Sequence, residues 1–291
     1  RYPELSELWR QEITRLSGMN GPEPTQRCLR LRYRLAELLA GPLKRPDCAE
    51  EQYRKIVETD VGQEPVRDAL ESLYRTRDRL APLSDLLEER VGRAADGEAA
   101  SKIRLAQAHV SERLERIDAA LGQLEEVLQR SKDPALRGRA LRNLVRLYRR
   151  ERRSADLANT LSTFANEPHV GAAERSALKS ELGVVLAREL ERPDDAIEAF
   201  SHALRLDAGN VPAARGLADL YRQKEQWGEV AEVYQKEASA KVDHTRRVWL
   251  WGQIGRIREQ QGELPQARDA FRKALELDEH SLVALRGLAE V

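Results

Sequence analysis

The chain has 291 residues, of which 34% are charged and 5% are aromatic, and its 49 basic residues balance its 49 acidic residues. A formal charge of zero argues against bulk attraction to nucleic acid or anionic lipid, and the mean hydropathy of -0.63 is typical of a protein with a large wetted surface. The longest apolar runs, such as residues 184–187, are far shorter than the roughly 20 residues that cross a bilayer. Composition therefore excludes a membrane span within the sequence.

An internal repeat organises the chain. The tripeptide Leu-Tyr-Arg occurs at residues 73–75, 147–149 and 220–222, and the copies are separated by 74 and 73 residues. A second module alternates with the first, so that each module covers about half of this period. Modules with a length in the mid thirties are typical of stacked helical hairpins.

The modules have the apolar spacing of helices. Leu141, Leu144 and Tyr148 fall at positions i, i+3 and i+7, which places them on one face of a helix. Proline with a nearby aspartate, at residues 132–134 and 192–195, indicates helix starts. Because no segment alternates with the period of a strand, the sequence predicts an all-α fold.

Within each hairpin the pattern resembles the tetratricopeptide repeat family. Trp251, Ile254 and Gly255 match the pattern of the family's first helix, and Ala267 and Phe271 match the pattern of its second helix. In this pattern the small residue allows two helices to approach closely, and the aromatic ring fills the gap beside it. Similar positions recur in register from about residue 25 to the end. Departures from the family pattern stand at Arg258, Leu83 and Leu157.

The resemblance implies a right-handed superhelical solenoid of antiparallel helix hairpins over residues 1–291. Complete repeats are expected at residues 25–62, 64–97, 99–133, 134–168, 172–208, 210–243 and 244–279. Residues 1–17 align with second helices and residues 281–291 align with first helices, so each is expected to be half of a repeat whose partner is absent. We interpret the sequence as part of a longer array.

The residue types that usually carry chemistry are sparse. Cys28 and Cys48 are too few for a disulfide framework and lack metal-ligand spacing, so two ordinary thiols are expected. The acidic pair at residues 194–195 suits the first turn of a helix, where carboxylates interact favourably with the helix dipole. The sequence has no phosphate-binding glycine loop, zinc-protease motif or nucleophile elbow. We therefore expect a non-catalytic protein without cofactor or metal.

One helix combines its apolar face with a row of arginines. At about 100° per residue, the side chains opposite Leu144 and Tyr148 are Arg139, Arg142, Arg146, Arg149, Arg150 and Arg153. Residues 134–153 contain eight arginines and one acid, Glu151. Like charges three or four residues apart destabilise a helix by about 0.2 to 0.5 kcal/mol per pair, so nearby anions are expected.

Those anions have two alternative sources. In the structural interpretation they are carboxylates of adjacent first helices, namely Glu112, Glu115, Glu174 and Glu181. In the functional interpretation the anion is a partner, because the resemblance implies that first helices line a concave groove that holds extended peptides. The ligand-binding residues are then Arg139, Arg142, Arg146, Arg149 and Arg150. The row does not match the family's clamp of spaced Lys and Asn, so a C-terminal carboxylate is not specifically implied.

Trp249 and Arg256 are a second candidate for this groove, on a different face of their helix from Trp251, Ile254 and Gly255. An exposed tryptophan beside a cation is a typical anchor for a partner. The alternative is that Trp249 covers the neighbouring repeat, as aromatic side chains often do.

We expect a protein–protein interaction scaffold that binds partner proteins or peptides, including acidic ones, in its concave groove. One alternative is a recruitment or regulatory arm of an enzyme whose catalytic domain lies outside the sequence. Nucleic-acid binding through the arginines ranks last, since aromatic residues are not interleaved with them and the net charge is zero. We expect no small-molecule substrate and no membrane insertion. We do expect end-to-end self-association through the uncapped ends. The composition resembles arrays of multiprotein complexes in GC-rich bacteria, with a cytoplasmic location, or a periplasmic one if a signal precedes the sequence.

Overall fold

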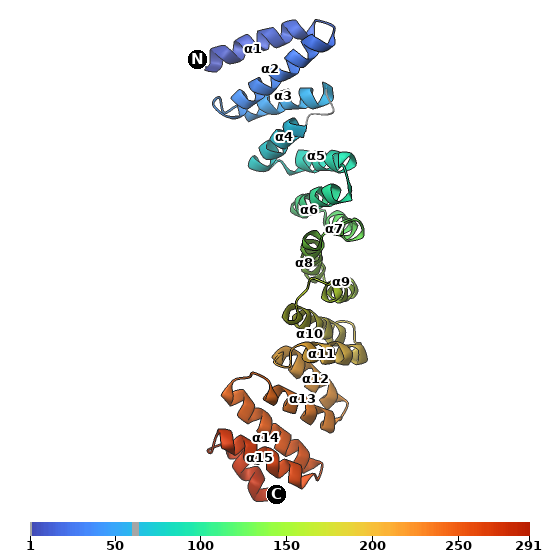
Figure 1. The fold of residues 1–291 in the computed structure, drawn as a ribbon, viewed down its shortest axis with the longest axis vertical. Coiled ribbons are helices and arrows are strands. Elements are labelled where there is room, and N and C mark those ends of the chain that lie inside the picture. Colours follow the sequence, from blue (N-terminus) through green and yellow to red (C-terminus); the bar gives the residue numbers. More distant parts are fainter. Residues whose placement is uncertain (1, 60–63) are drawn as a thin grey trace. The chain divides into compact units, whose positions relative to one another are not determined.

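The computed structural model describes residues 2–59 and 64–291, and these residues form α-helices joined by short turns, with no β-strand among them (Figure 1). The helices are α1 (Tyr2–Ser17), α2 (Pro22–Ala40), α3 (Pro46–Thr59), α4 (Glu64–Thr76), α5 (Leu80–Arg93), α6 (Gly97–Arg113), α7 (Ile117–Arg130), α8 (Pro134–Arg150), α9 (Ser154–Asn166), α10 (Ala172–Arg188), α11 (Pro193–Leu206), α12 (Val211–Gln223), α13 (Trp227–Ser239), α14 (His244–Gln260), α15 (Leu264–Leu277) and α16 (Leu282–Glu290). The all-α prediction of stacked helical hairpins is confirmed.

Packing divides the chain into two compact units, one ending at Ser131 and the other running from Lys132 to Val291. Unit 1 contains α1 to α7 and unit 2 contains α8 to α16, and within each unit consecutive helices pack against each other. The repeat boundaries, the handedness and the continuity of the expected solenoid stay predictions. The expected repeat end at residue 62, and residue 1, lie outside the described residues.

The proline signals place helix starts correctly. Helix α8 begins at Pro134, and the carboxylate of Asp133 caps it by accepting a hydrogen bond of 2.9 Å from the backbone N–H of Ala135. Helix α11 begins at Pro193. Proline fits here because the first residues of a helix need no backbone donor.

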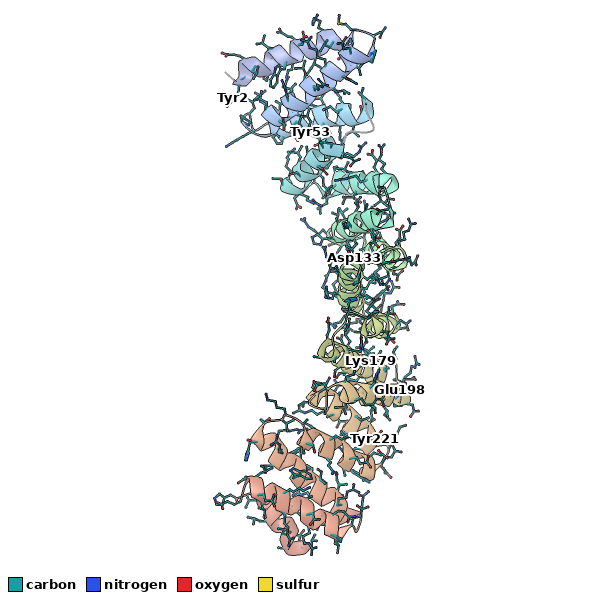
Figure 2. The ribbon with its side chains drawn as sticks, in the orientation of Figure 1. Tyr2, Tyr53, Asp133, Lys179, Glu198 and Tyr221 are labelled. Carbon is teal, nitrogen blue, oxygen red and sulfur yellow. The ribbon has the colours of Figure 1, made fainter. Side chains whose placement is uncertain are left out.

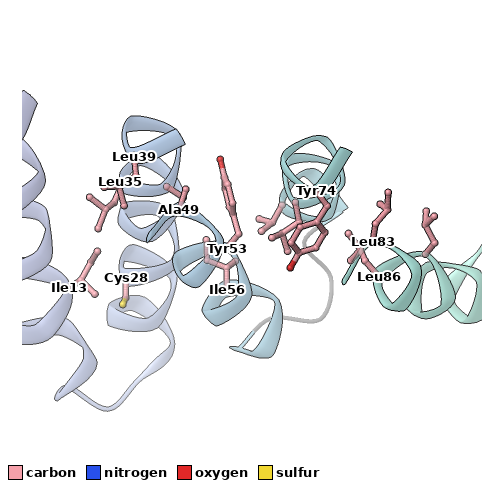
Figure 3. Packing of buried hydrophobic residues seen from close by; sticks show 14 of the residues in the cluster. Ile13, Cys28, Leu35, Leu39, Ala49, Tyr53, Ile56, Tyr74, Leu83 and Leu86 are labelled. Carbon is pink, nitrogen blue, oxygen red and sulfur yellow. The ribbon is translucent and has the colours of Figure 1, made fainter. Parts of the chain in front are cut away.

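The core of unit 1 is a chain of buried side chains that passes from one helix to the next (Figure 3). Tyr53 of α3 is 4% exposed and its ring meets that of Tyr33 edge-on, at 5.9 Å between centroids. Burial raises the pKa of Tyr53 to about 12. Cys28 is buried in the same cluster and Cys48 is partly buried, and both are free thiols.

In unit 2 one aromatic ring joins two successive hairpins. Phe200 of α11 lies between Gly183 of α10, in its own hairpin, and Gly216 of α12, in the next hairpin. A Cβ atom at Gly183 would come within 2.7 Å of the ring, and one at Gly216 within 2.5 Å. Because ordinary carbon contacts are about 3.5 to 4.0 Å, only glycine fits at these two positions without displacing the ring.

The same arrangement recurs one period later. Phe271 of α15 lies between Gly255 of α14 and Gly287 of α16, where added Cβ atoms would come within 2.3 and 2.2 Å of the ring. In unit 1 the hairpin of α6 and α7 has Ala108 and Leu124 at the corresponding distances from the start of its second helix, and both are buried. The α6–α7 hairpin thus has leucine where the α14–α15 hairpin has phenylalanine, and alanine where it has glycine.

The turns inside the hairpins share one backbone conformation. At the turn after α4, the N–H of Asp78 bonds to the carbonyl of Arg75 at 3.2 Å and that of Arg79 bonds to the carbonyl of Tyr74 at 2.9 Å, which is a helix-ending motif usually built on glycine. Gly262 provides the expected residue in one turn, with φ 75°. Residues other than glycine adopt φ between 52° and 59° at Lys44, Asp78, Glu115, Arg152, Glu191 and Glu225.

A polar link joins α10, α11 and α12. Asn210 caps α12 through the N–H of Ala213 at 3.0 Å, and its amide nitrogen donates to the hydroxyl of Ser176 at 2.8 Å. The same hydroxyl donates to the carbonyl of Ala203 at 2.9 Å. Ser176 is fully buried, so this network fixes the two hairpins relative to each other.

Candidate functional site

The arginine row of α8, which we define as Arg139, Arg142, Arg146, Arg149 and Arg150, lies on the exposed side of the helix. The opposite side is buried in unit 2, with Leu144 at 1% and Tyr148 at 3% exposure. No acidic residue lies within Pro134–Arg150. The helix therefore presents its cations to the surface, while its apolar residues hold it in place.

Part of the row has carboxylate partners close by. Arg149 forms an ion pair with Glu181 of α10, and the Nε of Arg150 donates to Glu151 at 2.8 Å. The guanidinium of Arg142 lies 5.9 Å from the ring centroid of Phe164. Arg139 is exposed and makes no ion pair with any described residue. Arg149 and Arg150 thus have carboxylate partners of the kind that the structural interpretation expects, whereas Arg139 has none among the described residues.

The acids that the structural interpretation named are divided between the two units. Glu174 and Glu181 belong to unit 2. Of these two, Glu181 forms an ion pair with a described residue of that unit and Glu174 does not. Glu112 and Glu115 belong to unit 1.

A nearby ion pair was missed from the sequence. Arg137 donates from Nε to Glu167 at 3.0 Å, and Glu167 is only 7% exposed. This hydrogen bond raises the pKa of Arg137. The two residues lie on the two ends of the α8–α9 hairpin, and no short-range pattern connects them.

Trp249 belongs to a cluster with Arg246, Tyr234 and Glu237, which we call the Trp249 cluster. The guanidinium of Arg246 lies 4.3 Å from the indole centroid, and the ring of Tyr234 meets the indole edge-on at 5.5 Å. Trp249 nevertheless remains 42% exposed. It both covers Tyr234 of the preceding helix α13 and presents surface to solvent, so both expected roles fit the same side chain.

Arg246 is held in place by a buried carboxylate. Its Nε and one terminal nitrogen donate to the two oxygens of Glu237 at 2.9 and 3.0 Å, and the Glu237 side chain is 0% exposed. The spacing of Arg246 and Trp249, three residues apart on a helix, is the signal that would have identified the stacking pair. Arg256, the predicted partner, is exposed and lies two turns further along α14.

Several titratable side chains of unit 2 line a cavity of about 260 Å³ between α9, α10 and α11. Lys179, Glu198 and His202 line it, and the first two are labelled in Figure 2. Burial and then the neighbouring Lys179 lower the pKa of His202. Across residues 2–59 and 64–291, no three potential metal ligands come together, and no helix has the length and apolarity required to cross a membrane.

Residues 250–281 match the family model described as Tetratricopeptide repeat. The match covers α15 and most of α14, including Gly255 and Phe271, and the same packing of glycine on phenylalanine recurs at Gly183 and Phe200. Residues 250–281 are therefore a tetratricopeptide repeat. The arginine row lies on α8, and Trp249 and Arg246 lie on α14, the first of the two helices that the match includes, whereas Tyr234 and Glu237 lie on α13.

Several solved structures are similar in fold to this one. A crystal structure of MamA protein is 21% identical, with 62% of this chain and 92% of that chain covered and a TM-score of 0.40. The C-terminal part of a repeat-containing protein from Cytophaga hutchinsonii is 14% identical, with coverage of 88% and 99% and a TM-score of 0.43. The TPR2AB domain of yeast Sti1, in a complex described as pHSP90, is 12% identical, with coverage of 90% and 96% and a TM-score of 0.40. No curated protein matches the chain.

Proposed function

We propose that this protein is a non-catalytic interaction scaffold, and that the open end of its arginine row binds an acidic segment of a partner protein. The observation that carries the proposal is the charge of α8, which has six arginines and no acid in its 17 residues. Arg139 and Arg142 are the proposed contact residues, since both are exposed and neither has an ion pair with a described residue.

The physical basis is relief of repulsion. Successive arginines three or four residues apart repel each other, and this destabilises the helix unless anions approach. Arg149 is already partly neutralised by Glu181, whereas Arg139 and Arg142 are not. A carboxylate-rich segment would accept bidentate, charge-assisted hydrogen bonds from these two guanidinium groups.

The proposal assigns two roles to the row. Arg149 and Arg150, which have carboxylate partners, contribute to the local structure, whereas Arg139 and Arg142 contact the partner. Exposed contacts of this kind act over about one Debye length, roughly 8 Å at physiological ionic strength. Binding should therefore weaken steeply as salt is added.

The test is charge reversal with a matched control. The double variant Arg139→Glu/Arg142→Glu should lose binding of a labelled poly-glutamate peptide, measured by fluorescence anisotropy, while its unfolding midpoint stays level or rises slightly. The control Arg268→Glu/Arg272→Glu makes the same charge change on exposed positions of α15 in the same unit. Equal loss in both variants would show that only net charge matters, and unchanged binding in the first variant would refute the proposed site.

A further inference from the structure

The Trp249 cluster holds an exposed aromatic ring in one orientation. Arg246 covers the indole from one side at 4.3 Å, and Tyr234 contacts it edge-on at 5.5 Å. An exposed tryptophan that is free to rotate loses entropy when a partner binds, whereas a fixed one does not. The arrangement is therefore that of a prepared contact surface.

The buried pair of Glu237 and Arg246 explains how the orientation is maintained. Glu237 is fully buried and both of its oxygens accept hydrogen bonds from Arg246, whose side chain is 16% exposed. Buried ion pairs are weak stabilisers compared with apolar side chains of similar volume, so stability alone is a poor reason for this one. Its clear effect is to fix the guanidinium on which the indole of Trp249 stacks.

Trp249 and Arg256 lie seven residues apart, on the same face of α14. Gly252, between them in the sequence, is buried, and Gln253 is half-buried. A Cβ atom at Gly252 would come within 3.3 Å of Val283 of α16, so the side chain of Val283 covers this position. Arg256 is exposed and has no ion pair among the described residues, which leaves its charge available to an anion.

We propose that Trp249 and Arg256 together bind an extended partner segment in the polyproline II conformation, with an apolar side chain on Trp249 and a carboxylate three residues away on Arg256. This inference rests on the proposed scaffold function and specifies the partner's chemistry at a second place in unit 2. It is independent of the arginine row of α8.

The spacing supports this conformation. Trp249 and Arg256 are seven residues apart, which is about 10 Å along a helix at about 1.5 Å per residue. In polyproline II, three residues advance the chain by about 9 Å and return the side chain to the same side. In a β-strand, side chains three residues apart point to opposite faces. Aromatic surfaces are also the usual docking sites for polyproline II segments.

The test compares peptides of equal composition. Labelled peptides containing Leu-Pro-Pro-Glu or Glu-Pro-Pro-Leu have the required three-residue spacing in either chain direction, and one containing Leu-Glu-Pro-Pro does not. We expect the first or the second to bind at least about tenfold more tightly than the third. Trp249→Ala and Arg256→Ala should each reduce that affinity by about tenfold, as expected for anchor residues. Trp227→Ala is the matched control, because Trp227 of α13 is 40% exposed in the same unit.

A positioning variant separates orientation from folding. Replacing the buried pair together, as Glu237→Leu/Arg246→Met, removes the stacking guanidinium without leaving a buried charge unpaired. We expect retained stability, a change in Trp249 fluorescence and weaker peptide binding. Equal affinity for all three peptides, or an effect of Trp227→Ala as large as that of Trp249→Ala, would overturn the inference. Binding of poly-glutamate to the α8 row would be unaffected by these variants, so the two proposals can fail separately.

Discussion

The glycine at position 255 provides a direct test of how the hairpins pack. In Gly255→Ala, the new methyl group would come within 2.3 Å of the Phe271 ring, more than 1 Å closer than ordinary carbon contacts. The ring has no room to move away, because Gly287 packs against it as well and an added Cβ there would come within 2.2 Å. The substitution therefore forces a shift of a helix or of the ring.

The expected magnitude follows from two opposing effects. Overpacking of a close-packed core costs about 1 to 3 kcal/mol, and the upper end applies where the neighbour is blocked. Replacing glycine by alanine inside a helix contributes up to about 1 kcal/mol in the opposite direction. We expect a net loss of about 2 kcal/mol in the free energy of unfolding.

Gly122→Ala is the matched control, because Gly122 lies inside α7 and no heavy atom would lie within 4 Å of the new methyl group. It should gain about 0.4 to 1 kcal/mol. Urea denaturation followed by far-ultraviolet circular dichroism measures both variants. If Gly255→Ala were as stable as Gly122→Ala, the packing argument would be wrong. The double variant Gly255→Ala/Phe271→Leu should recover part of the loss, since it copies the small residue and leucine found in the α6–α7 hairpin.

Two further outcomes are expected. Burial raises the pKa of Tyr53 to about 12, so the folded state favours the neutral phenol, and the stability it contributes is present below pH 10 and lost as the pH rises toward 12. Tyr53→Phe should make the loss of stability between pH 10 and 12 shallower, and an unchanged slope in alkaline denaturation curves would contradict this. Arg149→Glu should lower the free energy of unfolding by about 0.2 to 1 kcal/mol, because it breaks the exposed pair with Glu181. The double variant Arg149→Glu/Glu181→Arg should restore this stability. No recovery in thermal melts would mean that the pair contributes nothing.

Local periodicity was enough to predict the helices. The spacing of Leu144 and Tyr148 depends only on helix geometry, and both side chains are buried as that spacing requires. The family pattern also identified Gly255 and Phe271, although not the second glycine, Gly287, that meets the same ring from the next hairpin. Contacts within one hairpin follow from short-range spacing, whereas contacts between hairpins depend on how the hairpins stack.

The candidate site was less predictable for the same reason. The sequence paired Trp249 with Arg256, whereas the structure stacks Arg246 on the indole. The position of Arg246 depends on Glu237, which belongs to the preceding helix and whose burial has no signature in the sequence. Likewise, the number of arginines in α8 can be read from the sequence. That Arg149 pairs with Glu181, rather than with Glu112, Glu115 or Glu174, cannot be predicted from it.

The left-handed residues in the hairpin turns have a practical consequence. Six turns adopt the same backbone conformation with lysine, aspartate, glutamate or arginine, so the fold imposes its geometry there without selecting a side chain. A left-handed residue other than glycine costs roughly 1 kcal/mol, and that cost is already present in the native chain. Each turn residue is exposed, and replacement by another L-amino acid that is not β-branched adds little new strain. The turns are therefore equivalent attachment points: cysteines introduced at Asp78 and Glu225, after replacement of Cys28 and Cys48, would carry a pair of fluorescent labels on the two units with little effect on either core.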